Sequence, residues 1–207
     1  RYFFNTLFIT VAGTGLHVIF ASMAAYVLEK HRFYGRNAFF GLVVMTLMFS
    51  PTVTSIPNFV IMSGIGFVDT YLALIIPAIG SSLGLFLMKQ FCEGIPGEIL
   101  EAARVDGANE AKTFITIVLP MVKPGIGALA IFTFINSWND YFMQLVMLSS
   151  NSNFTISLGI ATLQAETTVD MGLLMAGAAL AAIPIIIVFL IFQKYFTKGI
   201  TMGAVKG

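Results

Sequence analysis

The chain has 207 residues; 57% of them are hydrophobic, only 10% are charged, and the formal net charge is +1. Soluble domains carry about a quarter charged residues, so this composition excludes a globular protein surrounded by water and predicts lipid as the main solvent. A single cysteine, Cys92, excludes an intrachain disulfide, and no neighbouring histidine or second cysteine supports a reactive thiol.

Five stretches are long and apolar enough to cross a membrane, which requires about 20 residues. The expected fold is therefore an all-α membrane protein, a polytopic helical bundle that forms one transmembrane domain over residues 1–207. Because the chain begins at Arg1 rather than Met, we expect that an N-terminal part is missing. The predicted spans are Phe4–Leu28, Asn37–Pro57, Thr70–Met88, Pro124–Leu148 and Met171–Gln193.

The second stretch is expected to be interrupted. The uncharged run Asn37–Val68 is too long for one straight span, and Pro51 and Pro57 stand within it among serine and threonine residues. Interrupted helices persist only where protein or a water-filled cavity satisfies the freed backbone groups. We predict that both prolines break this run and leave a short segment at the outer face. The run Tyr141–Ala165 contains Ser149–Asn153, which is typical of a loop.

Two further features of the spans indicate packing. Gly80 and Gly84 have the GxxxG spacing, which predicts a close helix crossing, with a second membrane subunit as one candidate partner, rather than a ligand site. His17 is expected to be buried and hydrogen-bonded in the first span, and His31 to be solvated in the loop that follows. Neither has partners at metal-ligand spacing, so no metal site is predicted.

Basic residues predict the orientation of the spans. Ten of the eleven fall on one side of the five-span arrangement, and only Arg1 falls on the other. Because loops rich in lysine and arginine stay in the cytoplasm, the basic side and the C-terminus are predicted to be cytoplasmic. The ten are Lys30, Arg32, Arg36, Lys89, Arg104, Lys112, Lys123, Lys194, Lys198 and Lys206.

The cytoplasmic loop at residues 89–123 is long and is expected to be ordered. A helical stretch, Glu98–Val105, is followed by Gly107, where a left-handed helix cap requires a residue without Cβ. Asn109 is expected to cap a second helix, which Pro120 stops. The predicted structure is a helix–glycine–helix unit across the cytoplasmic face.

The charge of this loop bears on what it contacts. An amphipathic helix resting on the lipid surface is one possibility, but such helices favour lysine and arginine. A short helix with small residues and exposed acids fits better as a ridge that docks into a groove on a soluble partner. The acids of the loop are Glu93, Glu98, Glu101, Asp106 and Glu110.

The spacing within this loop resembles a known family. Importer-type ABC permeases carry a loop with the pattern EAA-x3-G-x9-I-x-L-P. This chain matches the pattern without departure, with EAA at Glu101-Ala102-Ala103, the glycine at Gly107 and the closing residues at Ile117-Val118-Leu119-Pro120. The sequence EAARVDG at residues 101–107, the sequence WND at 138–140 and the closing GITMGAVKG resemble the sugar-importing, MalG-like subgroup. The resemblance covers essentially the whole chain, although family members usually carry about six spans and the first is absent here.

The resemblance implies a type I ABC importer permease in a bacterial or archaeal cytoplasmic membrane. Its partners would be two ATP-binding subunits, a second, MalF-like permease subunit and an extracytoplasmic solute-binding protein, with no nucleic acid. The chain itself would bind no cofactor, since ATP and Mg²⁺ are used by the partner subunits. The loop would be a coupling helix in a cleft of the ATPase, with contacts from Glu101, Ala102, Ala103, Asp106, Gly107, Leu119 and Pro120, and a second contact from Val205, Lys206 and Gly207.

Polar residues in the fourth predicted span are candidates for the path of the cargo. Asn136, Asp140 and Gln144 lie four residues apart, so on a continuous helix they share one face, whereas Trp138 points elsewhere. Amides and a carboxylate suit hydrogen bonding to an uncharged polyol. The alternatives are that these groups join neighbouring helices, or that Asp140 reaches outer water.

Three classes of function remain to be weighed. The chain has no GxxxxGK[ST] phosphate loop and no Ser-His-Asp or HExxH arrangement within its spans, so a non-catalytic permease subunit for a sugar or oligosaccharide is favoured. A permease for an amino acid, phosphate or glycerol-phosphate is the alternative within this class. An ion-coupled carrier would require buried acid–base pairs, and only Asp140 is available; an intramembrane enzyme would require converging titratable groups.

Overall fold

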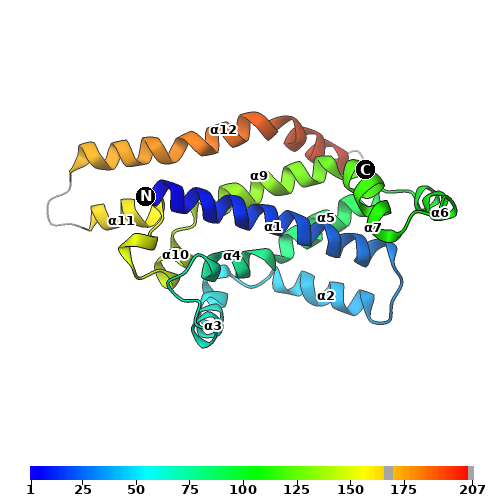
Figure 1. Ribbon diagram of the computed structural model, residues 1–207, viewed down its shortest axis with the longest axis horizontal. Helices are drawn as coiled ribbons and strands as arrows, with labels where there is room; N and C mark the ends of the chain where they lie inside the picture. The colour runs from blue at the N-terminus through cyan, green and yellow to red at the C-terminus, as the bar shows by residue number, and fades with distance from the viewer. Residues whose placement is uncertain (166–169, 205–207) are drawn as a thin grey trace.

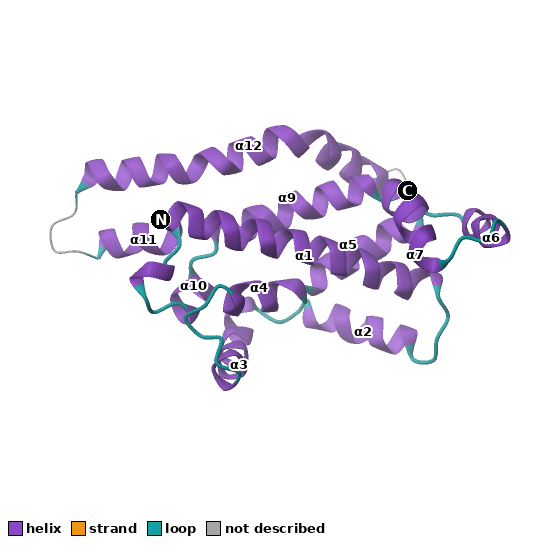
Figure 2. Cartoon of the chain, viewed as in Figure 1, coloured by secondary structure: helices purple, strands orange, loops and turns teal. Residues whose placement is uncertain are grey.

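The computed structural model describes residues 1–165 and 170–204, with residues 194–204 described as backbone. Within this part the chain forms helices and connecting loops and no strand (Figure 2). The helices are α1 Tyr2–Lys30, α2 Arg36–Thr46, α3 Pro51–Gly64, α4 Leu72–Ile79, α5 Ser82–Glu93, α6 Gly97–Val105, α7 Glu110–Thr113, the π-helix η1 Phe114–Val118, α8 Leu119–Met121, α9 Lys123–Asn139, α10 Phe142–Met147, the 3-10 helix η2 Asn151–Asn153, α11 Ile156–Gln164 and α12 Met171–Ala204.

α1 is the central element of an elongated bundle (Figure 1). It packs against α4 and α5 on one side and α9 on the other, and α12 packs on α9. Small and hydroxyl-bearing residues such as Thr10, Gly13 and Ala25 form its buried face, and such residues let helices approach closely in a membrane. The short helices α6 and α7 lie at one end of the bundle, while α10 and α11 lie at the other.

The spans agree with the sequence in number when bent helices are counted as single spans. Tyr2–Lys30, Leu72–Glu93 and Met171–Gln193 are long and apolar enough to cross a membrane, and two bent helix pairs raise the number in the described residues to five. Most side chains of Met171–Gln193 in α12 are exposed, as are the apolar side chains of α3 other than Met62. Such apolar surfaces require contact with lipid or with another membrane subunit.

The predicted interruption of the second span is confirmed at Pro51 and wrong at Pro57. The chain bends by 108° between α2 and α3. Ser50 accepts a hydrogen bond from the Thr52 N–H at 3.3 Å, and Pro51 occupies the first turn of α3, where no N–H is needed. Pro57 lies inside α3 without ending it. Pro57 removes only the N–H that would serve the Val53 carbonyl, and membrane helices tolerate a proline better than soluble helices do.

Two boundaries near the cytoplasmic loop and the fourth span also differ from expectation. Pro120 does not stop the second loop helix: η1 is a wider π turn, so the helix continues to Met121 and bends by 77° into α9. The fourth span, predicted as one helix to Leu148, ends at Asn139. Asp140 is extended, with φ −64° and ψ 117°, and its Oδ1 accepts the Met143 N–H at 3.1 Å. That side-chain bond favours the start of a new helix, α10, over continuation of α9.

Candidate functional site

The helix–glycine–helix unit of the loop is confirmed. Pro96 is extended at the N-terminus of α6, and Gly107 has a φ of +78°, in the left-handed region that favours glycine. The Ala108 N–H donates to the Ala103 carbonyl at 3.0 Å, so the turn closes the end of α6. Asn109 Oδ1 accepts the Lys112 N–H at 2.8 Å and caps α7. This unit projects at one end of the bundle (Figure 1).

α6 has a buried face and an exposed face. Leu100 and Ala103 are buried, Leu100 within the core cluster, while Glu101 and Ala102 are exposed. Ala103, which was expected to share a docking surface with Glu101 and Ala102, is turned inward in this chain. The outward face also carries two apolar side chains that the sequence comparison did not single out, Ile99 and Val105.

Three exposed residues spaced three apart, Ile99, Ala102 and Val105, thus form an apolar strip beside Glu101. An exposed apolar strip with an adjacent carboxylate suits contact with a protein groove. Of the other residues expected to take part, Asp106, Gly107 and Pro120 are exposed and Leu119 is half-buried. Val205, Lys206 and Gly207 lie outside the described residues.

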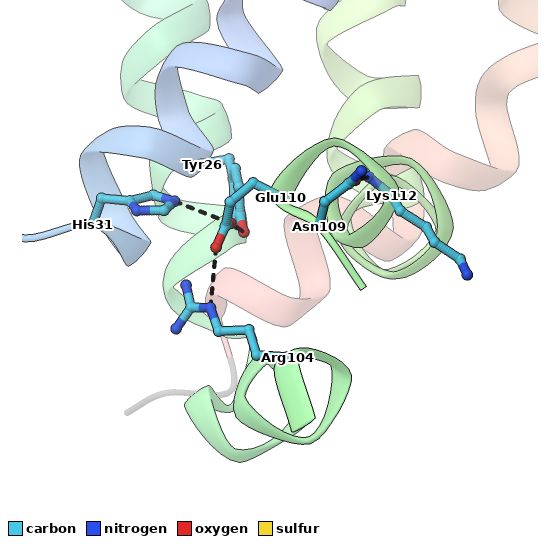
Figure 3. A network of polar contacts seen from close by, with 6 residues as sticks. All are labelled: Tyr26, His31, Arg104, Asn109, Glu110 and Lys112. Carbon is cyan, nitrogen blue, oxygen red and sulfur yellow. Dashed lines mark hydrogen bonds and ion pairs between the residues drawn. The ribbon is translucent and has the colours of Figure 1, made fainter. Parts of the chain in front are cut away.

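Glu110 is the centre of a polar network that joins α6, α7 and the end of α1 (Figure 3). Its Oε2 accepts a hydrogen bond from the Tyr26 hydroxyl at 2.6 Å, and its Oε1 accepts one from Arg104 Nε at 3.0 Å. His31 Nε2 lies 3.4 Å from the same Oε2, so the expectation of a merely solvated His31 is wrong. The hydrogen bond from Tyr26, reinforced by Arg104, lowers the pKa of Glu110 and keeps it ionised.

A cavity of about 740 Å³ lies between α1, α4, α9 and α10. Its volume is within the range of ligand pockets, about 300–1,000 Å³. Amide, hydroxyl and aromatic groups line it together with apolar side chains, and its described lining includes one carboxylate, Asp140, and no lysine or arginine. The principal polar and aromatic lining residues are His17, Thr52, Ser81, Phe132, Thr133, Asn136, Ser137, Asn139, Asp140, Tyr141, Phe142 and Gln144.

The three predicted pathway residues line this cavity, but not as a stripe on one helix. The break at Asp140 places Asn136 on α9 and Gln144 on α10. Asn136 is exposed and donates to the Phe132 carbonyl at 2.7 Å. Gln144 is buried and hydrogen-bonded to the Thr155 hydroxyl, so it also joins α10 to α11. The expected separate orientation of Trp138 is confirmed, since it is buried and donates to the Ala181 carbonyl at 3.0 Å.

His17 is buried and hydrogen-bonded, as predicted, and it also reaches the cavity wall. Its Nδ1 lies 3.0 Å from the Ile79 carbonyl oxygen, and its ring lies against Gly84 of α5. Gly84 therefore provides a close crossing within this chain. A Cβ built on Gly80, in contrast, would meet only the Pro77 carbonyl oxygen, at 3.8 Å. The GxxxG spacing predicted the close approach, while the residue that fills the gap lies 67 positions away in the sequence.

At the opposite end of the bundle, Asp69 joins two loops that the sequence did not connect. It has a φ of 63°, in the left-handed region, which aspartate tolerates better than most residues. Its Oδ1 accepts the backbone N–H groups of Ser149 and Ser150, each at 2.9 Å, and Asn153 donates to its carbonyl oxygen at 2.7 Å. The hydrogen bonds from Ser150 and Ser149 lower the pKa of Asp69 to about 2.

Comparison with known proteins gives consistent relatives. The chain is 39% identical to the arabinooligosaccharide transport permease AraQ of Halalkalibacterium halodurans, over all of this chain and 74% of the relative. It is 35% identical to the melibiose/raffinose/stachyose import permease MelC of Bacillus subtilis, over 99% of this chain and 75% of the relative. A solved bacterial ABC transporter for the acidic polysaccharide alginate superposes with a TM-score of 0.81 at 28% identity, covering 94% of this chain and 74% of that chain.

The family model for the inner membrane component of binding-protein-dependent transport systems matches residues 17–202, which include the loop, all of the cavity lining except Ile9, and most of the bundle. The chain belongs to this family, the membrane-spanning permeases of ABC importers.

Proposed function

We propose that this chain carries an oligosaccharide or other neutral sugar through the membrane as one of two permease subunits. The cavity is the observation that carries the proposal: amides, hydroxyls and aromatic rings line it, and these are the groups that bind an uncharged polyol. The relatives named for arabinooligosaccharides and for melibiose, raffinose and stachyose support a sugar cargo. A phosphate or glycerol-phosphate cargo would favour lysine or arginine, and neither stands in the described lining.

The chain is a non-catalytic permease and a multi-pass protein of the cytoplasmic membrane. On our proposal the α6 end and the C-terminus face the cytoplasm, and the end that carries Asp69 faces outward, where a solute-binding protein would deliver the sugar. The distribution of basic residues supports this orientation. Two ATP-binding subunits that use ATP and Mg²⁺ and a second permease subunit would complete the importer.

We propose further that the exposed face of α6 docks on an ATP-binding subunit. The apolar strip Ile99, Ala102 and Val105 would enter a groove, and Glu101 would contact a basic or polar group at its edge. Asp106 and Gly107 would set the turn beside this contact, with Leu119 and Pro120 behind it. The C-terminal residues 205–207 are proposed as a second contact on the same subunit.

Charge reversal at Glu101 tests the docking role. Glu101→Lys in the assembled importer should reduce co-purification of the ATP-binding subunit and ATP-dependent sugar uptake by at least tenfold, because it places a cation where an acid is proposed to meet a basic or polar group. Glu93→Lys is the matched control, since Glu93 is an exposed acid of the same loop outside α6. If Glu101→Lys and Glu93→Lys both leave co-purification and uptake unchanged, α6 is not the docking surface.

A further inference from the structure

One carboxylate connects the proposed docking helix to the central helix of the bundle. Glu110, the first residue of α7, accepts hydrogen bonds from Arg104 of α6 and from Tyr26 in the last turns of α1. His31, directly after α1, lies 3.4 Å from the same carboxylate. Figure 3 shows these side chains converging on Glu110 from separate segments of the chain. Tyr26 and Glu110 are 84 residues apart in the sequence.

The remaining contacts of α6 with the bundle are mainly apolar. Leu100 is buried in a cluster with Ala25, Ile95 and Val118. Apolar contacts are non-directional, so they hold α6 near the bundle without fixing its angle. Hydrogen bonds to a charged group are stronger and have a defined geometry. Lys30, the last residue of α1, also donates to the Ile95 carbonyl at 2.7 Å, but that bond reaches only the turn before α6. The Glu110 network therefore provides the directional contact between α1 and α6 itself.

α1 extends from this network to the cavity. It is a single helix from Tyr2 to Lys30 without an internal proline, and its residues His17 and Ile9 line the cavity. At 1.5 Å per residue these positions lie about 14 and 26 Å from Tyr26 along the helix. Uninterrupted helices bend only gently, so a displacement of one end of α1 moves the cavity wall.

We propose that Glu110 is a positioning residue that makes α6 and α1 move as one body, so that motion imposed on α6 reaches the cavity wall through α1. This inference rests on the proposed docking role of α6 and specifies the path from that surface to the cargo. Without the Glu110 network, α6 would still dock but would slide on its apolar contacts, and part of each ATP-driven movement would not reach α1.

The test measures sugar transported per ATP hydrolysed by the complete importer in proteoliposomes. Glu110→Gln removes the charge that pairs with Arg104, and Tyr26→Phe removes only the hydroxyl donor. Each should lower the ratio about three- to tenfold, the range expected for a partly exposed charged hydrogen bond, while ATPase co-purification stays unchanged. The double variant should be no worse than the poorer single variant, because both changes break one link. Glu93→Gln, in the same loop but outside the network, should keep the original ratio.

Several results overturn the inference. An unchanged ratio in Tyr26→Phe and Glu110→Gln means that α6 and α1 are coupled by other contacts. Loss of ATPase co-purification in Glu110→Gln means that Glu110 acts in docking. A fully additive double variant means that Tyr26 and Glu110 act independently. If Glu110→Gln does not assemble, Tyr26→Phe decides alone. Failure of the docking proposal is seen separately, as unchanged co-purification in Glu101→Lys.

Discussion

The crossing of α1 and α5 at Gly84 gives a quantitative test of the packing. A Cβ built on Gly84 would lie 2.0 Å from His17 Nε2 and 2.5 Å from Cε1. Ordinary contact begins near 3.4 Å, so Gly84→Ala requires the ring to move by more than an ångström or the helices to separate. The ring is held by its Nδ1, 3.0 Å from the Ile79 carbonyl oxygen, and movement would weaken that hydrogen bond.

Overpacking of this kind costs about 1–3 kcal/mol, and the weakened hydrogen bond lies within that range. For a chain of this length the change corresponds to a fall in melting temperature of about 2–4 °C per kcal/mol. Thermal unfolding of the detergent-solubilised importer measures it. Gly80→Ala is the matched control, because its Cβ meets only the Pro77 carbonyl oxygen at 3.8 Å.

The double variant Gly84→Ala with His17→Ala should recover part of the loss, since the clashing ring is gone. Equal melting temperatures for Gly84→Ala and Gly80→Ala would refute the reasoning. A double variant that simply adds the two losses would show that His17 is not the residue that limits the crossing.

Three further outcomes are expected. Asp140→Asn with Gln144→Ala should lower uptake or change the range of sugars accepted, measured with labelled sugars, and unchanged transport would make both residues structural. The contact of Asp69 with the loop at Ser149 and Ser150 should persist from neutral pH to about pH 4. The pKa of Asp69 is depressed, so its ionised form stabilises the contact at any pH above the ordinary aspartate pKa, and this stability is lost as pH falls through about 2. Limited proteolysis of the outer loops across pH measures this, with Asp69→Asn as a variant in which the contact is weakened at every pH. Asn109→Ala should cost about 1 kcal/mol by loss of the α7 cap, seen as a lower melting temperature, whereas the exposed Lys112→Ala should cost little.

Local signals in the sequence predicted the loop well. The glycine at Gly107, the cap at Asn109 and the short helix before them are each decided by residues within a few positions, and the structure confirms all three. The inward turn of Ala103 was missed because the motif identifies the helix and not its rotation. Hydropathy located the spans, since the width of the membrane sets their length.

The errors arise where distant residues decide the structure. No glycine or proline marks the break at Asp140, and hydropathy does not distinguish one long span from a helix followed by a second, shorter one. The contacts of Asp69 with Ser149 and of Glu110 with Tyr26 join segments about 80 residues apart, and no spacing rule predicts them. The sequence thus predicted which residues are polar and which of them lie near the ends of the spans, but not which of them meet.

The breaks in the helices have a consequence for how a cargo would be held. The start of α3 at Pro51, the start of α5 after Ser81 and the break at Asp140 all border the same cavity. Helix ends carry backbone N–H and C=O groups outside the regular ladder, which no side-chain substitution removes. If the cavity holds the sugar as proposed, an alanine scan of its lining would therefore underestimate sugar binding, because main-chain contacts to the hydroxyls would remain.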